Sequence, residues 1–150
     1  RGFVSFDPNI RADLWHDEVE LRQCLERALA CADVVKISVE ELAFLTGNAQ
    51  VHEGLAALMR TCPARLVLVT QGKEGVTAWQ KGALTHYPAS PVECIDTTGA
   101  GDAFVAGLLF GLARDGQARL SEVITLAQRC GALATTAKGA MTALPYHHEL

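Results

Sequence analysis

The most informative part of the sequence is 96-DTTGAGDAF-104, a glycine-rich turn with one aspartate at its start and another near its end. Glycine-rich turns that lead into a helix present backbone amides to an anion. Here, however, Asp102 brings a carboxylate to the place where an anion would lie. The sequence has no Walker A loop. It matches the dinucleotide fingerprint GxGxxG at Gly99 and Gly101 but has Phe104 at the third glycine position.

The carboxylate of Asp102 is compatible with the turn if the anion is a transition state rather than a resting ligand. The amides of residues 98–101 could then stabilise a phosphoryl group during its transfer. A carboxylate in the first turn of a helix is favoured by the helix dipole, and it could accept the proton of an attacking hydroxyl. Phosphoryl transfer to an alcohol needs both features. The alternative is a structural turn in which Asp102 only stabilises the helix.

Short β-branched runs alternate along the chain with amphipathic helical stretches, which predicts an α/β fold with a largely parallel sheet. Ligands of such sheets bind beyond the carboxyl ends of the strands, where Asp7, Ser38, Thr70 and Asp96 are expected. The predicted elements are strand 3–7, helix 17–33, strand 33–38, helix 39–46 ended by Gly47, helix 51–62, strand 65–72, a hairpin over 75–88 with its turn at Lys81 and Gly82, strand 92–96, helix 103–114 and helix 121–136 with Ser121 as N-cap.

Composition excludes several classes of protein. The 150 residues are 49% hydrophobic and 20% charged, with a net charge of -4, so a nucleic-acid partner is not expected. No apolar run approaches the roughly 20 residues that cross a bilayer, and no signal peptide opens the chain, which predicts a cytoplasmic protein. Five cysteines without a CxxC pair predict reduced core thiols rather than disulfides or a zinc site. The absence of an initiator methionine suggests the carboxy-terminal part of a longer protein.

Four segments carry a resemblance to one family. DTTGAGDAFVAGLL (96–109) resembles the carboxy-terminal signature of the ribokinase-type (PfkB) carbohydrate kinases. DPNIRADLW (7–15) is similar to the DPNxR segment of the fructokinase branch, TQGKEGV (70–76) to the T-x-G-x-x-G nucleotide segment, and TTAKGAMTALP (135–145) to the closing loop. The resemblance spans residues 2–145. It implies a ribokinase-like three-layer fold with a mostly parallel central sheet. Residues 1–150 would be its nucleotide-binding and catalytic part, and the sugar-binding and lid part would precede them.

The resemblance also implies an activity, the transfer of the γ-phosphoryl group of ATP, with Mg²⁺, to a primary hydroxyl of a sugar. Because the segments are most similar to the fructokinase branch, the expected reaction converts D-fructose to fructose 6-phosphate. Asp102 would be the catalytic base, with Gly99, Ala100 and Gly101 as the anion hole. Arg11 would approach the phosphates or the sugar, unless it forms an ion pair with Asp13 or Asp17. The nucleotide would be bound by Ser38, Glu41, Thr70, Gly72, Gly75 and Gln128.

One position departs from the family pattern. The family's N-x-x-E motif has Ser38 in place of its asparagine here, with Glu41 retained. A serine can still hydrogen-bond a phosphate oxygen or a water, but over a shorter reach. Glu41 could instead be an exposed helix carboxylate, and the glycines at 72 and 75 could belong to an ordinary turn.

The resemblance further implies a potassium ion beside the anion hole. Its predicted ligands are Asp96, Thr98, Ala134, Ala137 and Gly139. Alternatively, Asp96 only caps the turn. Ala143 stands where the family often has a serine ligand.

Other functions remain open: a kinase of another sugar, a sugar acid or a nucleoside, a silent sugar-responsive binding protein, or a dinucleotide-dependent oxidoreductase. A homodimer is a further prediction.

Overall fold

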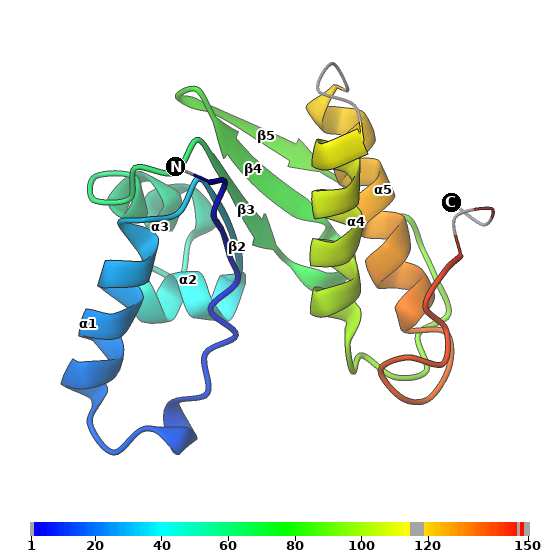
Figure 1. The fold of residues 1–150 in the computed structure, drawn as a ribbon, viewed down its shortest axis with the longest axis horizontal. Helices are drawn as coiled ribbons and strands as arrows, with labels where there is room; N and C mark the ends of the chain where they lie inside the picture. The colour runs from blue at the N-terminus through cyan, green and yellow to red at the C-terminus, as the bar shows by residue number, and fades with distance from the viewer. Residues whose placement is uncertain (1, 115–118, 147, 149–150) are drawn as a thin grey trace. The chain divides into compact units, whose positions relative to one another are not determined.

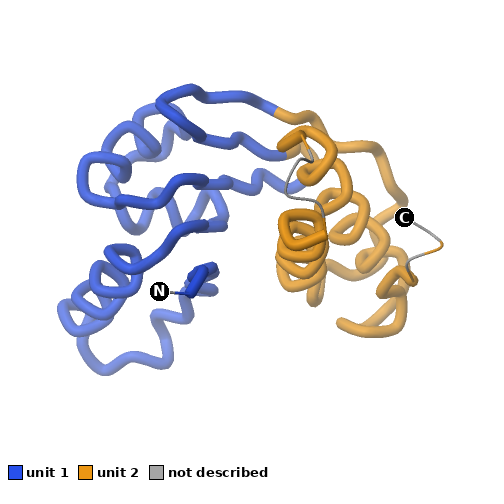
Figure 2. The backbone as a smooth tube through the Cα atoms, turned by 45° about the horizontal axis from the view of Figure 1, so that its top comes forward, with its two compact units in different colours: residues 1–72, 76–86 blue, residues 73–75, 87–150 orange. Residues whose placement is uncertain are grey.

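The structure, a computed structural model, describes residues 2–114, 119–146 and 148. The chain forms two compact units (Figure 2). Unit 1 comprises residues 1–72 and 76–86, and unit 2 comprises residues 73–75 and 87–150. Unit 1 contains the sheet, except Tyr87 at the end of its last strand, and the three helices between residues 18 and 58 (Figure 1). Unit 2 contains the two helices between residues 100 and 134.

The sheet is mixed, with its five strands in the order β1-β2-β3-β4-β5. The first three strands are parallel, as the alternation of strands and helices predicts, and β4 runs antiparallel to β3. Ser38 and Thr70, the last residues of β2 and β3, are direct partners in the register. The strands are β1 (Ser5–Phe6), β2 (Val34–Ser38), β3 (Leu66–Thr70), β4 (Val76–Gln80) and β5 (Ala83–Tyr87).

The hairpin of β4 and β5 turns at Lys81 and Gly82, as predicted. Both residues have positive φ angles, 52° and 82°. A two-residue turn of this kind matches the right-handed twist of the flanking strands, and it favours glycine because the backbone is left-handed there. This local signal is therefore sufficient to define the hairpin.

The helices of unit 1 are α1 (Glu18–Leu29), α2 (Val39–Thr46) and α3 (Val51–Leu58), and a 3₁₀ turn, η1, covers Ala12–Leu14. Asp17 caps α1 by accepting the amide of Val19, and Gly47 ends α2 in a left-handed conformation, with φ of 72°. The predictions of helix over 17–33 and 51–62 are too long. After Leu29 and Leu58, the amides of Cys31 and Thr61 bond carbonyls three residues back, which closes each helix with a tighter turn.

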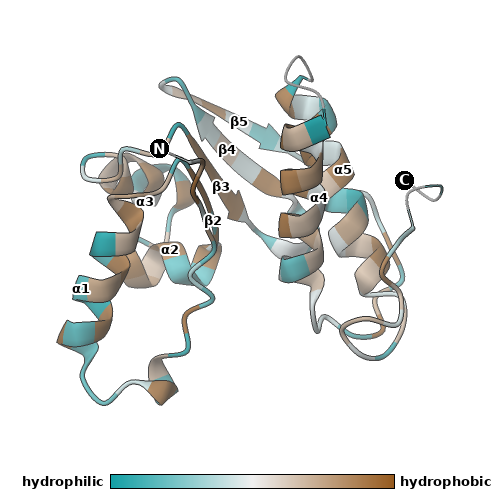
Figure 3. Cartoon of the chain, in the orientation of Figure 1, coloured by the Kyte–Doolittle hydropathy of each residue, from teal (hydrophilic) through white to brown (hydrophobic). Residues whose placement is uncertain are grey.

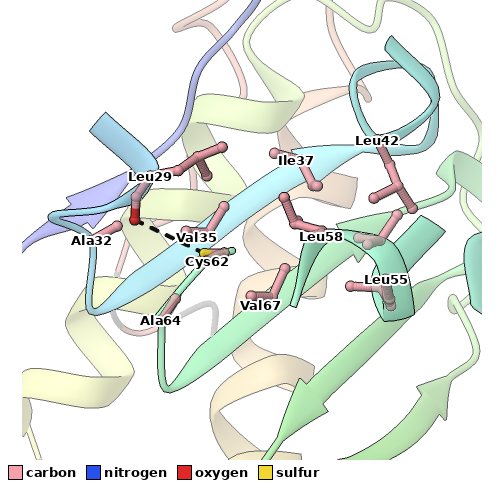
Figure 4. Close-up of a cluster of buried hydrophobic side chains, with 11 residues drawn as sticks. Leu29, Ala32, Val35, Ile37, Leu42, Leu55, Leu58, Cys62, Ala64 and Val67 are labelled. Atoms are coloured by element: carbon pink, nitrogen blue, oxygen red, sulfur yellow. Dashed lines mark hydrogen bonds between the residues drawn. The ribbon is translucent and has the colours of Figure 1, made fainter. Parts of the chain in front are cut away.

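The core of unit 1 lies between β2 and β3 and the three helices (Figure 4). Strands β2 and β3 are hydrophobic along most of their length, whereas α1 carries both polar and apolar residues (Figure 3). The Cys62 thiol lies in this core, 3.9 Å from the Leu29 carbonyl, and burial raises its pKa. The expectation of core thiols is correct for Cys62 and for Cys130 in unit 2 but wrong for Cys31 and Cys94, which are exposed.

In unit 2, helices α4 (Ala100–Arg114) and α5 (Leu120–Ala134) pack closely through small residues. A Cβ atom on Gly107 of α4 would lie 2.7 Å from the sulfur of Cys130 and 3.0 Å from the Cα of Ala127. Phe104 is buried beside Gly131 of α5. Phe104 therefore serves the packing of two consecutive helices, and no second βα unit follows α4 within the described residues.

The predicted starts of both helices need correction. Helix α4 begins at Ala100 rather than Ala103, so the GAGD residues form its first turn. Helix α5 begins at Leu120 with Arg119 as N-cap, and no side chain caps it. Ser121 is therefore not the cap. Its carbonyl accepts the hydroxyl of Thr125 within the helix.

The predicted strand over residues 92–96 is also wrong. The amides of Ile95 and Asp96 both donate to the Thr135 carbonyl, at 2.8 and 3.1 Å, so a loop after α5 holds this segment. Val92 and Ile95 remain 45% and 64% exposed. Asp96 consequently does not follow a strand, whereas Asp7, Ser38 and Thr70 lie at or just after the ends of parallel strands.

No helix in the described part of the chain combines the length and hydrophobicity that crossing a membrane requires.

Candidate active site

The start of α4 is open to a ligand. Asp102 lies in its first turn with an exposed side chain. Of the four amides predicted to face an anion, those of Thr98 and Ala100 already donate to Asp96 and to the Thr97 carbonyl, at 2.9 and 3.1 Å. Among the described residues, the amides of Gly99 and Gly101 have no acceptor. The predicted set of four donors is thus reduced to two free amides beside a free carboxylate.

Gly99 brings this turn against the closing loop. Its φ of 79° is unfavourable for residues with a Cβ. A Cβ there would also lie 2.9 Å from the carbonyl oxygen of Ala140 and 3.0 Å from its Cα. Only glycine satisfies both the backbone conformation and the close approach, so this position has a structural reason for its identity.

Asp96 links the same turn to the closing loop by hydrogen bonds. One carboxylate oxygen accepts the amide and the hydroxyl of Thr98, at 2.9 and 2.7 Å, and the other accepts the amide of Gly139 at 2.8 Å. These bonds lower the pKa of Asp96 to about 2. The bond from the Thr98 hydroxyl contributes most, followed by those from the amides of Gly139 and Thr98. The capping role is therefore present. The carboxylate also connects two loops that lie 43 residues apart in the sequence.

The predicted potassium ligands partly gather here. Asp96, Thr98 and Gly139 are joined by these hydrogen bonds, and Thr135, which accepts the Ile95 and Asp96 amides, directly follows Ala134. An ionised carboxylate has about four acceptor positions, and three of those on Asp96 are used. One position remains for a cation, so the oxygen-rich donor set fits such an ion.

Two predicted nucleotide residues of unit 2 meet at residues 87–89. The side-chain amide of Gln128 donates to the carbonyls of Tyr87 and Pro88, at 3.0 and 3.2 Å. Gly75 has a φ of 103°, and a Cβ there would lie 2.7 Å from the amide nitrogen of Ala89. Gly75 and Gln128 therefore contact the same short segment, although they are 53 positions apart in the sequence.

In unit 1, Ser38 and Glu41 form the capping box of α2. The Ser38 hydroxyl accepts the Glu41 amide at 3.2 Å, and the Glu41 carboxylate accepts the Ser38 amide at 2.7 Å. Its other oxygen accepts the amide of Ile10 at 2.8 Å. The alternative of an exposed helix carboxylate for Glu41 is wrong, because this half-buried side chain joins the loop after β1 to α2.

Thr70 and Gly72 continue this edge of the sheet. The Thr70 hydroxyl donates to the Ile37 carbonyl at 3.3 Å. Gly72 has a φ of 56° and opens the 3₁₀ turn η2 (Gly72–Glu74). The turn given above as the alternative for the glycines at 72 and 75 is therefore present, and both residues adopt left-handed backbone.

Arg11 is exposed and forms no ion pair with a carboxylate in the described part of the chain. Its guanidinium makes one long hydrogen bond, 3.4 Å, to the Ile10 carbonyl. Asp17, one of the partners considered for Arg11, caps α1 instead. The guanidinium therefore stays available to a ligand.

Sequence reasoning missed two polar features. Lys36 and Asp7 form an ion pair at 3.3 Å with side chains only 10% and 18% exposed, and a lysine inside the apolar run VVKIS was the available signal. The second is a chain of hydrogen bonds from Gln71 through Thr77 to His86. No local pattern indicates it, because the three residues come from different strands or strand ends.

Comparison with known proteins gives consistent matches. The model of the pfkB family carbohydrate kinases matches residues 1–146. A fructokinase of Klebsiella pneumoniae is 60% identical over an alignment 153 positions long, which covers 99% of this chain and 50% of that protein. The chain spans about half the length of most of the curated relatives it matches.

Solved structures agree with the sequence matches. A double-mutant fructokinase from Vibrio cholerae O395 with fructose, ADP and potassium bound has 45% identity and a TM-score of 0.90, over 99% of this chain and 49% of that one. Aminoimidazole riboside kinase from Salmonella enterica, complexed with aminoimidazole riboside and an ATP analogue, has 38% identity and the same TM-score, over 99% and 50%.

Proposed function

The chain belongs to the pfkB family of carbohydrate kinases, and we propose that it is the nucleotide-binding and catalytic part of an ATP-dependent kinase that phosphorylates D-fructose on a primary hydroxyl. The 60% identity to a fructokinase supports the choice of sugar. The observation that carries the proposal is the start of α4, where the exposed carboxylate of Asp102 stands beside the free amides of Gly99 and Gly101. Further residues of the protein would hold the sugar.

Asp102 would act as the general base. As the sugar oxygen attacks the γ-phosphorus, its proton passes to the Asp102 carboxylate, and the bond from phosphorus to the bridging oxygen breaks so that ADP leaves. The amides of Gly99 and Gly101 would stabilise the charge on the phosphoryl oxygens in flight. The first turn of α4 suits both tasks because the amides of Gly99 and Gly101 and the carboxylate of Asp102 bond no other group among the described residues.

The nucleotide is expected to contact Ser38, Thr70, Gly72, Gly75 and Gln128. Magnesium would neutralise charge on the ATP phosphates. Glu41 fits the role of holding metal-bound water, since each of its oxygens accepts one amide and keeps a further acceptor position. Arg11, exposed and without an ion pair in the described residues, would bind phosphate or sugar oxygens.

Potassium is expected beside the anion hole, held by Asp96 and by carbonyls of Thr98, Ala134, Ala137 and Gly139. The related Vibrio cholerae structure has potassium bound. The ion would keep the Thr98–Gly101 backbone aimed at the phosphoryl group, an electrostatic preorganisation.

A nucleoside kinase is the second candidate. It is favoured by the 38% identity to a kinase complexed with aminoimidazole riboside. Both substrates offer a primary hydroxyl, so the open start of α4 serves either reaction. A dinucleotide-dependent oxidoreductase is disfavoured, because α5 follows α4 where a second βα unit would be needed.

An acceptor screen tests the proposal. The full-length protein is given ATP and Mg²⁺ with fructose, ribose, a sugar acid or a riboside, and ADP release is followed together with the phosphorylated product. The highest kcat/KM is expected for fructose, and a higher value for the riboside would select the second candidate. The 150-residue chain alone is expected to show no sugar-dependent ATP consumption, because the acceptor is not held near Asp102. The homodimer stays a prediction for sedimentation analysis.

A further inference from the structure

A buried hydroxyl lies at the centre of a hydrogen-bond chain across three neighbouring strands of unit 1. Thr77, in β4, is only 3% exposed. Its hydroxyl oxygen lies 2.7 Å from the side-chain oxygen of Gln71, the residue after β3, and 3.1 Å from Nδ1 of His86 in β5. All three side chains line one cavity of about 520 Å³ together with the segment that starts α3, residues 49–53.

The direction of each hydrogen bond follows from the donors available. The Thr77 hydroxyl has one hydrogen, which it donates to the side-chain oxygen of Gln71. Its oxygen can therefore only accept from His86, and Nδ1 of that ring must carry a hydrogen. The chain runs from His86 through Thr77 to Gln71. Gln71, at the end of this chain, is the only one of the three residues that lies in the segment 70–76 expected to bind the nucleotide.

Gln71 stands between two residues expected to contact the nucleotide, Thr70 and Gly72. Gly72 has a left-handed backbone, and nothing lies within 4 Å of the place where its Cβ would be. Packing therefore does little to restrain the chain at this point, and a glycine has many backbone conformations available. The side chain of Gln71, held through Thr77 and His86, supplies a restraint at the residue just before it.

We propose that His86 and Thr77 are positioning residues, which hold Gln71 and so keep the backbone of Thr70–Gly72 in the conformation that binds ATP. The inference rests on the proposed kinase function for its substrate. Neither side chain needs to touch the nucleotide, because both act through Gln71. Their loss should weaken nucleotide binding and leave the phosphoryl-transfer step, which depends on Asp102, largely unchanged.

The test uses three substitutions in the full-length protein. His86→Leu removes the first donor, Gln71→Leu removes the acceptor, and Thr77→Val replaces the central hydroxyl with a methyl group of similar shape. His86→Asn is the rescue variant, because an asparagine amide can donate from nearly the place of Nδ1. His52→Leu is the matched control, since His52 is exposed and lines the same cavity but makes no hydrogen bond among the described residues.

The three substitutions should each raise KM for ATP about 3- to 10-fold, the effect of losing one neutral hydrogen bond, with kcat and KM for fructose within about twofold. His86→Asn should recover most of the affinity, and His52→Leu should behave as the parent. Thr77 is buried, so a variant there also tests folding. The His86 and Gln71 variants change side chains that are exposed or half-exposed, so their results do not depend on an effect on folding.

Equilibrium binding of ADP, measured by calorimetry on the same variants, separates this inference from the proposed function. If the parent protein phosphorylates none of the acceptors, the proposed function fails, while the ADP affinities still decide the role of His86 and Thr77. ADP and ATP affinities equal to those of the parent, or a His86→Asn variant no better than His86→Leu, would overturn the positioning role.

Discussion

The starts of α2 and α4 use similar residues in opposite ways. Helix α2 opens with Ser38 and Glu41, whose side chains and amides bond each other in a closed capping box, and the remaining oxygen of Glu41 takes the amide of Ile10. Helix α4 opens with a glycine turn and Asp102, and its carboxylate is exposed with two amides nearby that have no acceptor among the described residues. Both helices place a carboxylate at their third position.

This contrast separates a terminus whose amides are satisfied by the protein's own side chains from one that keeps amides without an acceptor among the described residues. A helix leaves its first amides without partners inside the helix, and side chains, water or a ligand must satisfy them. In α2 the protein supplies its own acceptor, so the terminus is stable and largely occupied. In α4 the amides of Gly99 and Gly101 and the Asp102 carboxylate have no partner among the described residues, and the proposed function gives them a phosphoryl group and its acceptor to bind.

The largest effect is expected at the open terminus. Asp102→Asn should lower kcat of the full-length protein by about 10² to 10⁴, the usual scale for a positioned base, with little change in ATP affinity. Glu122→Gln, in the first turn of α5, is the matched control and should have normal turnover. Near-normal kcat for Asp102→Asn would assign this residue a structural role only.

Gly99→Ala should come next, because it combines a left-handed backbone with contact to Ala140. It should lower the free energy of unfolding by about 2 to 3 kcal/mol and reduce kcat as the turn shifts. Gly47→Ala controls for the backbone alone, since Gly47 has a φ of 72° and open space around it. It should cost about 1 kcal/mol in urea denaturation and leave kcat unchanged. Equal costs for both variants would show that the close approach to Ala140 is unimportant.

A smaller effect is expected from the potassium ion proposed beside the open terminus. Replacing potassium with tetramethylammonium at matched ionic strength should lower kcat about tenfold, because the amides lose an ion that orients them. Asp96→Ala should abolish the difference between the two salts. Equal rates of the unmodified protein in both salts would leave Asp96 with its hydrogen-bonding role alone.

The hydrogen bonds that Asp96 accepts from Thr98 and Gly139 should depend on pH, because the pKa of Asp96 is lowered to about 2. A carboxylate with a lowered pKa stabilises the folded state at pH values above its ordinary pKa of about 4, and this contribution is lost as the pH falls through 2. The amide resonance of Gly139 should therefore stay constant from pH 8 to 5 and shift with a midpoint near 2. A midpoint near 4 would show that the bonds to Thr98 and Gly139 are not maintained in solution.

At the closed terminus the expected effect on stability is smaller than that of Gly99→Ala. Glu41→Ala removes the capping box and the bond to Ile10, and it should lower the free energy of unfolding by about 1 to 2 kcal/mol in urea denaturation. Glu40→Ala, in the same turn but exposed, should change it by less than about 0.5 kcal/mol. If Glu41→Ala were as mild as Glu40→Ala, α2 would not depend on its cap.

The sequence by itself was sufficient at three features whose deciding interactions are local. Lys81 and Gly82 define a hairpin, Gly47 ends a helix, and 96-DTTGAGDAF-104 indicates both the family and its open turn, because each depends on backbone preferences within a few residues. Neighbouring residues could not reveal that residues 92–96 form no strand. A strand needs a partner, and here the amides of Ile95 and Asp96 bond Thr135 instead.

Tertiary structure alone decided which candidate groups are already in use. Glu41 meets Ile10 across 31 residues and Asp96 meets Gly139 across 43, and the strand order brings Gln71, Thr77 and His86 onto one chain of hydrogen bonds. Within the turn before α4 the deciding bonds are short-range instead: the amides of Thr98 and Ala100 bond Asp96 and Thr97, and only the bond from Gly139 to Asp96 is long-range. The physical reason is that a hydrogen-bonding group is satisfied by whichever partner the fold brings within about 3 Å, and sequence distance does not report that separation.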